Sequence, residues 1–276
     1  MKRFLPVLIA LLILLSSTVG VRADFQKGFD AYIKKDYLTA LREFEPLVKQ
    51  GHIDAQHSLG VMSYKGYGLP KNDQAAVKWF TLAAEQGHAF AQNNLGQMYV
   101  KGEGVPQNKK TAAKWLTLAA EQGVANAQFT LGVMYSQGQG IPRNDKTTVK
   151  WLTLAAEQGH ANAQFNLGWM YDNGYGVPKN DKVAVKWFTL SAEQGYASAQ
   201  FNLGVMYYFG EGVIQNLVYA HMWLKIAASQ GNKDAIKNRD LCTKAMTAAQ
   251  IEKAQDLIIE CGKKKYKGCL TGGGHY

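Results

Sequence analysis

The sequence predicts an all-α protein, built as a solenoid of 36-residue helix–turn–helix repeats with a capping helical hairpin at each end. Two periodic residue types predict this class. Tryptophans recur every 36 residues, at Trp79, Trp115, Trp151, Trp187 and Trp223. Glycines recur with the same period, at Gly51, Gly87, Gly123, Gly159, Gly195 and Gly231. Such a period is typical of units that bury their apolar faces only against neighbouring units.

The first 23 residues have the pattern of a secretory signal peptide. Lys2 and Arg3 supply a positive start, residues 5–15 are almost entirely apolar, and Ala23 ends a short site of the kind that signal peptidases cleave. The apolar run is too short to span about 30 Å of hydrocarbon. We therefore expect cleavage after Ala23 and a periplasmic or secreted protein. A buried N-terminal helix is the alternative.

Composition and charge narrow the classes of function. The chain is 47% hydrophobic, which is enough for a packed core and excludes bulk disorder. Its formal net charge of +10 falls to +7 once residues 1–23, which carry three basic residues and no acidic one, are removed. This moderate charge does not favour a nucleic-acid partner without a clustered basic stripe. No segment after the leader is apolar for long enough to span a membrane.

Residues 24–50 are expected to form the N-terminal capping hairpin, and five repeats then occupy residues 51–230. In one unit the first helix covers about Ala89 to Lys101 and ends at a loop with glycines and a proline. The second helix starts near Asn108, a residue that can cap it, and ends at Gly123. The two helices cannot bury their apolar faces alone, so neighbouring units must stack.

The helical period assigns the faces of the first helix. Ala163, Leu167 and Met170 fall on one side and recur by type in each unit, so this side is the expected core. Gly168 and its equivalents lie mid-helix, where glycine costs about 1 kcal/mol relative to alanine. Its recurrence in each repeat predicts a close helix approach that leaves no room for a Cβ atom.

Residues 231–276 are expected to form C-terminal capping helices and a basic tail, with capping-box spacing at Thr247–Gln250. Cys261 and Cys269 flank a lysine-rich stretch, and in an oxidising compartment they can close a small disulfide loop. The stretch Lys263–Lys267 is either a solvated tail or a weak contact with an anionic envelope surface. Cys242 has the setting of a small buried apolar residue.

The repeat resembles a known family. Its pattern, A-x-A-Q-x-x-L-G-x-M-Y-x-x-G-x-G-V-P-x-N followed by A-x-K-W-x-x-x-A-A-E-Q-G, is similar to the Sel-one-like repeat (SLR), a relative of the tetratricopeptide repeat. The resemblance implies a right-handed α/α superhelix that mediates protein–protein contact, with the first helices lining a concave groove. Many such relatives are exported bacterial proteins. A cysteine-rich branch is linked to penicillin binding, but its cysteine pattern is absent between residues 24 and 230.

The first-helix face opposite the core is the candidate binding surface, because its residues vary between units while core positions barely change. The expected protein or peptide site in the groove consists of Phe129, Phe165, Trp169, Phe201, Tyr208, Asn94, Asn166 and Asn202. Aromatic anchors dominate the energetics of protein interfaces. Trp169 stands out because the equivalent residues are valine or glutamine. The alternatives are that the phenylalanines pack against the adjacent first helix and that the asparagines are ordinary surface amides.

No arrangement of catalytic residues is visible in the sequence. Ser-x-x-Lys and Lys-Thr-Gly, which a serine β-lactamase needs, are both missing. His52, His88 and His160 share one repeat position, so they are expected to lie too far apart for one metal ion. We assign no catalytic residue, metal site or cofactor.

The sequence therefore favours an exported repeat scaffold that binds a protein and is not an enzyme. Two alternatives remain at this point. One is a secreted hydrolase that acts on the cell wall or binds β-lactams. The other is an envelope-surface binder that works through the basic C-terminal loop.

Overall fold

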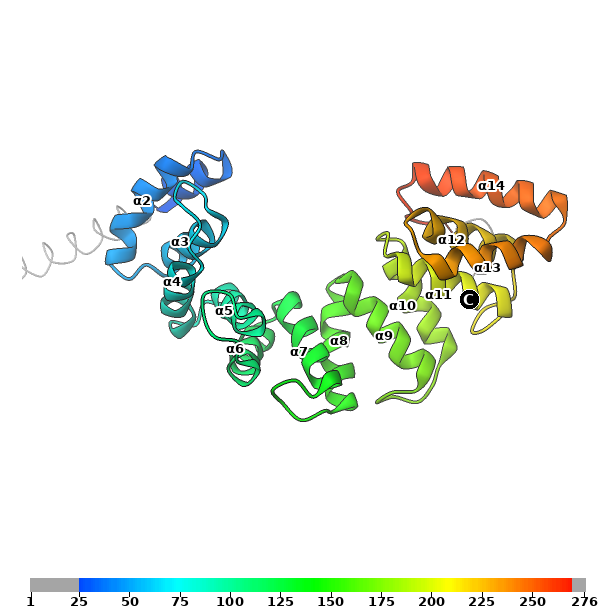
Figure 1. Ribbon diagram of the computed structural model, residues 1–276, viewed down its shortest axis with the longest axis horizontal. Coiled ribbons are helices and arrows are strands. Elements are labelled where there is room, and N and C mark those ends of the chain that lie inside the picture. The colour runs from blue at the N-terminus through cyan, green and yellow to red at the C-terminus, as the bar shows by residue number, and fades with distance from the viewer. Residues whose placement is uncertain (1–24, 270–276) are drawn as a thin grey trace, which may run out of the picture. The chain divides into compact units, whose positions relative to one another are not determined.

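The computed structural model describes residues 25–269, and all regular structure within that range is helical (Figure 1). The expected leader, residues 1–23, lies outside the described residues, as do residues 270–276. The chain divides into two compact units, which meet in sequence between Gln122 and Gly123. No helix among the described residues has the length and apolar character to cross a membrane.

The first unit consists of helical residues 25–33 and five further helices. These are α2 (Tyr37–Lys49), α3 (Ile53–Lys65), α4 (Asp73–Glu85), α5 (Ala89–Lys101) and α6 (Lys109–Glu121). Helix α2 packs against α3, α3 against α4, α4 against α5, and α5 against α6. Each element thus packs against the next one in the chain, as the repeat period predicts.

Within residues 123–269, the second unit consists of eight helices. These are α7 (Ala125–Gln137), α8 (Asp145–Glu157), α9 (Ala161–Asn173), α10 (Asp181–Ala192), α11 (Ala197–Phe209), α12 (Leu217–Ser229), α13 (Lys233–Lys244) and α14 (Ala248–Lys263). The same sequential packing runs from α7 to α13, and the last helix, α14, returns to pack against α12 (Figure 1). Consecutive helix pairs therefore stack as a repeat solenoid.

The helix ends form where the loop residues predict them. Asn108 Oδ1 accepts a hydrogen bond from the backbone N–H of Thr111 at 3.0 Å, and Asn72, Asn144 and Asn180 cap their helices in the same way. Gly102 ends α5 with a φ of 76°, which glycine adopts without steric cost. At the C-terminal end, Thr247 and Gln250 form the expected capping box.

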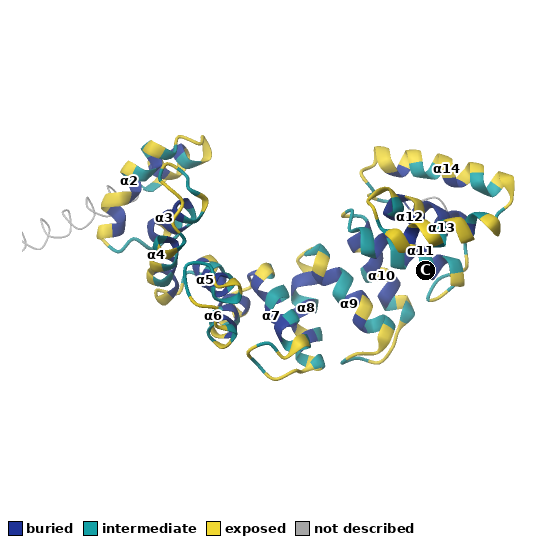
Figure 2. Ribbon diagram, in the orientation of Figure 1, coloured by how far each residue is buried: buried dark blue, intermediate teal, exposed yellow. Residues whose placement is uncertain are grey.

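At Gly60, Gly96, Gly168 and Gly204 the helices approach too closely for a Cβ atom, as the sequence predicts, and at Gly132 the approach is slightly looser. A Cβ atom on Gly168 would lie 2.8 Å from Cδ1 of Phe188 in the partner helix, and one on Gly96 would lie 2.7 Å from Cγ of Leu116. The first and second helices of a repeat therefore meet at the glycine. Phe188 and Leu116, which fill this contact, are fully buried. Figure 2 marks the buried residues along the helices of both units in dark blue.

A repeated pair of glutamines joins the helix ends. Gln164 of α9 donates from Nε2 to the carbonyl of Ala156 in the last turn of α8, at 3.1 Å. Its Oε1 accepts a hydrogen bond at 2.7 Å from Gln194, just beyond α10. Five such pairs occur, each with the same 2.7 Å bond: Gln56–Gln86, Gln92–Gln122, Gln128–Gln158, Gln164–Gln194 and Gln200–Gln230. In three of these pairs the buried member also donates to a carbonyl in the last turn of the preceding helix, that of Ala84, Ala156 or Ala192.

Candidate protein-binding surface

Trp169 lies on α9, on the side of the helix away from the core, and its side chain is 45% exposed. Its ring stacks on that of Tyr175 in the following loop, with ring centroids 5.0 Å apart and an angle of 14° between the planes. Tyr175 is itself 41% exposed. The residues at the Trp169 position in the other repeats, Val61, Gln97, Val133 and Val205, are half-buried. Trp169 and Tyr175 together, here called the aromatic pair, are therefore a local departure from the repeat.

Phe129 and Phe165 lie in the contacts between repeats. The Phe129 ring stacks on His160, the residue that begins the next first helix, with centroids 4.5 Å apart. The Phe165 ring lies 5.1 Å from the ring of Tyr196, at the equivalent place, and 5.8 Å from that of Phe188. Both phenylalanines are half-buried. The structure thus gives them a packing role against the adjacent repeat, which is one of the two alternatives that the sequence left open.

Phe201 and Tyr208 are half-buried residues of α11 that pack against the core of the second unit. Tyr208 also meets Phe209 edge to face, at 5.0 Å between centroids, and Phe209 is 63% exposed. Phe201 and Tyr208 therefore pack mainly against the core and contribute little to the exposed surface of α11.

The three candidate asparagines are also half-buried. Asn166 belongs to α9 and Asn202 to α11, in the same unit as the aromatic pair. Asn94 belongs to the first unit, where its Nδ2 lies 3.2 Å from Nε2 of His57. This contact joins α5 to α3, so Asn94 takes part in the packing of its own unit.

Charged side chains border the aromatic pair. Asp172 lies one turn beyond Trp169 on α9, and burial raises the pKa of its carboxyl, an effect that Lys179 opposes. Lys179 forms an ion pair with Asp181 at 3.3 Å. The surroundings of Trp169 therefore combine an exposed aromatic face with a partly desolvated carboxyl group, which suits contact with a partner carrying apolar and hydrogen-bonding groups.

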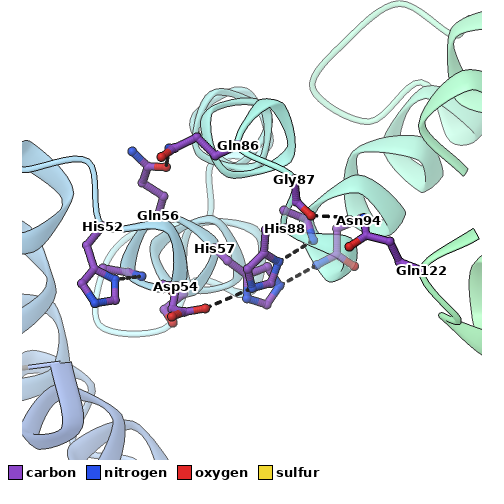
Figure 3. A network of polar contacts seen from close by, with 12 residues as sticks. His52, Asp54, Gln56, His57, Gln86, Gly87, His88, Asn94 and Gln122 are labelled. Atoms are coloured by element: carbon purple, nitrogen blue, oxygen red, sulfur yellow. Dashed lines mark hydrogen bonds and ion pairs between the residues drawn. The ribbon is translucent and has the colours of Figure 1, made fainter. Parts of the chain in front are cut away.

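His57 and His88 of the first unit form a network of contacts with Asp54 and Asn94 (Figure 3). The rings of His57 and His88 stack with centroids 4.4 Å apart. His88 Nδ1 accepts the backbone N–H of Ala91, and its Nε2 lies 3.4 Å from the Asp54 carboxylate. Burial, with a contribution from His88, lowers the pKa of His57 to about 4. Within residues 25–269, no three His, Cys, Asp or Glu side chains are grouped so that they could hold a metal ion.

Two of these features were missed at the level of sequence. The stacking partner of Trp169 comes from a loop position that holds Tyr67, Glu103, Gln139, Tyr175 and Glu211 in the five repeats, so nothing in its period marks it. The His57–His88 contact does have a signal in the sequence. Three pairs of residues that lie 31 positions apart have a ring on each member and are in contact: His57–His88, Phe129–His160 and Phe165–Tyr196.

Comparison with known proteins identifies the repeat. The family model described as Sel1 repeat matches five times, at residues 53–88, 89–124, 125–160, 161–196 and 197–232. No curated protein matches the chain.

Two solved structures are similar to it over most of its length. One is a protective antigen present in uropathogenic Escherichia coli strains that displays an SLR fold, with 33% identity and a TM-score of 0.79. That match covers 93% of this chain and 55% of the other, so this chain spans little more than half of the antigen's length. The other is a Sel1 repeat protein from Oxalobacter formigenes, with 36% identity, a TM-score of 0.72, and coverage of 77% of this chain and 88% of that one.

Proposed function

Because this chain belongs to the Sel1 repeat family, whose members generally mediate protein–protein interaction, we propose that it is an exported adaptor without catalytic activity. In this proposal a partner protein or peptide binds the first-helix face of the second unit. The aromatic pair of Trp169 and Tyr175 is the anchor of the site.

The exposure of Trp169 carries the proposal. Trp169, which is 45% exposed, and Tyr175, which is 41% exposed, place two adjoining aromatic rings at the surface, and contiguous exposed apolar surface is typical of contact sites. Tryptophan and tyrosine are enriched among residues that contribute most to binding. The stacked geometry also holds both rings in place before a partner arrives, so less side-chain entropy is lost on binding.

The other candidate residues have supporting roles in this proposal. Phe129, Phe165, Phe201 and Tyr208 are half-buried and fix the helices on which the surface lies. Asn166 and Asn202 are on the same two helices as Trp169 and Tyr208, α9 and α11, and their amides offer both donors and acceptors to a bound peptide.

Export is supported by the leader-like first 23 residues and by the disulfide between Cys261 and Cys269, because disulfides persist mainly in oxidising compartments. A similar protein is described as a protective antigen, which accords with a location outside the cytoplasm. In this proposal the adaptor acts in the periplasm or outside the cell.

The test is crosslinking in cell envelopes with the wild-type protein and Trp169→Glu. We expect the substitution to reduce the crosslinked partner at least tenfold, because it puts a charge at the centre of the apolar contact. Phe90→Glu is the matched control, since Phe90 is a 60% exposed aromatic residue in the first unit. Circular dichroism must show both variants folded. Equal partner recovery by Trp169→Glu and the wild type would remove this face as the site.

A further inference from the structure

The C-terminal loop is held in a fixed shape by three contacts. Cys261 and Cys269 are joined in a disulfide, and both are buried in the core of the second unit. The Tyr266 ring lies over Gly195, where a Cβ atom would be 3.7 Å from the ring. The backbone N–H of Gly268 donates to the carboxylate of Glu193 at 2.9 Å. The loop between the cysteines is therefore docked on the turn between α10 and α11.

The side chains that remain exposed to solvent at this docked loop are lysines. Lys263, Lys264, Lys265 and Lys267 are all exposed, whereas Tyr266 and Gly268 are half-buried. Lys264 pairs with Glu260 at 2.6 Å. Lys265 and Tyr266 both have positive φ values, 51° and 69°, which non-glycine residues rarely adopt. The fixed loop thus holds four like charges within five consecutive residues.

Helix stability accounts for only part of this charge. Basic residues near a helix C-terminus interact favourably with the helix dipole, which applies to Lys263 in the last turn of α14 and to Lys264 at its cap. Lys265 and Lys267 lie beyond the helix, where the dipole effect has fallen off. The helix dipole therefore does not account for Lys265 and Lys267.

The neighbouring surface of α14 adds an apolar group on the side of the lysines. Ile259 is 58% exposed and lies four residues before Lys263, so the two share a helix face. Glu252 and Asp256 share this face of α14, about two turns and one turn before Ile259, and Glu260 pairs with Lys264, so the face is basic only at its loop end. Lysines beside an exposed aliphatic residue are typical of surfaces that bind at the interface of anionic lipids.

We propose that the disulfide-closed loop 261–269, together with Ile259, is a docking surface for an anionic lipid bilayer. Its lysines bind the headgroup phosphates as point charges, and the isoleucine contacts the acyl boundary. This surface is independent of the aromatic pair, so the adaptor can be held at a membrane while its first-helix face remains open to a partner.

The test uses co-sedimentation of the protein, lacking residues 1–23, with two kinds of vesicle. One contains phosphatidylcholine alone, and the other contains an equal mixture of phosphatidylcholine and phosphatidylglycerol. We expect binding only to the anionic vesicles, and weaker binding as the ionic strength rises from about 0.01 M to about 0.15 M, where the Debye length falls from about 30 to about 8 Å. Equal binding to both vesicles, or none to either, would overturn the proposal.

Paired variants assign the binding to the loop. Lys265→Ala/Lys267→Ala should lower the partition coefficient about 25-fold, since each lysine near an anionic membrane contributes about a fivefold factor. Lys146→Ala/Lys182→Ala, which removes two exposed lysines from α8 and α10, is the charge-matched control and should lower it much less. Equal losses in the two pairs would mean that net charge, and not this loop, attracts the membrane, which contradicts the proposal.

Two further arms test the role of the disulfide and the nature of the partner. Cys261→Ser/Cys269→Ser keeps each lysine but frees the loop, and we expect it to bind anionic vesicles several-fold more weakly. Undiminished binding would overturn the assignment of the surface to a disulfide-held loop. A short duplex DNA is the competing polyanion. Binding to DNA as tight as to the vesicles, and lost in Lys265→Ala/Lys267→Ala, would overturn the assignment to a lipid surface.

Discussion

Phe165 and Trp169 lie one helical turn apart on the same face of α9, yet their surroundings differ. The Phe165 ring is enclosed by Phe188 and Tyr196, whereas the Trp169 ring meets Tyr175 and solvent. The difference arises because the residue that begins the next first helix covers the Phe165 position only. The Trp169 side chain, one helical turn further along, extends beyond that residue and is not covered by it. At the scale of single residues, exposure on this face therefore depends on the neighbouring repeat.

His57 occupies the Phe165 position in its own repeat, and its burial makes folding depend on pH. The pKa of His57 in the folded chain, about 4, is below the ordinary value of 6.5. Protonation therefore favours the unfolded chain. The stabilisation by the neutral ring is complete above about pH 6.5 and is lost as the pH falls toward 4.

We predict that His57→Phe, which places the residue of the later repeats at this position, flattens this dependence. Between pH 6.5 and 4.5 the wild type should lose about 2–3 kcal/mol more unfolding free energy than the variant. Urea unfolding at a series of pH values measures the difference, and the His57 ring resonances should titrate near pH 4. An unchanged pH slope in the variant would show that His57 is not the group responsible.

At the scale of helices, the repeat depends on the contact between the first and second helix at the mid-helix glycine. The closeness of this contact varies with the facing side chain. A Cβ atom at Gly168 would meet the rigid ring of Phe188 at 2.8 Å, whereas at Gly132 it would meet Leu152 at 3.1 Å. Alanine stabilises a helix interior by about 1 kcal/mol relative to glycine. The net effect of a Gly→Ala substitution on stability therefore depends on how far the facing side chain can move.

We therefore predict opposite outcomes for the same substitution in two repeats of the second unit. Gly168→Ala should destabilise the protein by about 1–3 kcal/mol, because the Phe188 ring must shift within a packed core. Gly132→Ala should change stability by less than about 1 kcal/mol, because Leu152 can adjust and the helix gains propensity. The midpoints of urea unfolding report both effects. Equal destabilisation by the two variants would argue against the ring clash as the cause.

At the scale of the whole molecule, stability in a repeat chain is approximately a sum of units and their nearest-neighbour interfaces. The described chain forms two compact units, and its C-terminal end is tied back by the disulfide and by the packing of α14 on α12. Loss of the disulfide should therefore destabilise mainly the helices next to it. Hydrogen exchange can measure this effect helix by helix.

We predict that reduction of the Cys261–Cys269 bond lowers the stability of the C-terminal cap by about 2–3 kcal/mol, the value expected for a loop of this length in the chain-entropy account. Amide exchange should accelerate in α14 and to a smaller extent in α12. Exchange in α3 and α4, which belong to the first unit, serves as the internal control and should not change. Accelerated exchange in both units alike would contradict a nearest-neighbour description.

Much of the fold was predictable because its determinants are local or strictly periodic. The residues Ala89–Lys101 predicted for one first helix are those observed, and the asparagine caps and the Thr247 capping box form as expected. The glycine contact could be inferred because the cost of a mid-helix glycine recurs in each repeat. The glutamine pairs recur with equal regularity, but polar spacing alone does not reveal a hydrogen bond between residues 30 apart.

The helices, their caps, the core side of each first helix and the repeat family follow from the sequence, because turn residues and apolar periods act over a few positions. Which candidate aromatic residues stay exposed depends on the packing of neighbouring repeats. Phe129 and Phe165 are covered by a residue 31 positions later, and Trp169 acquired Tyr175 from a loop. A helical period predicts the direction in which a side chain points from the axis of its own helix. Its burial depends on what the next repeat places there.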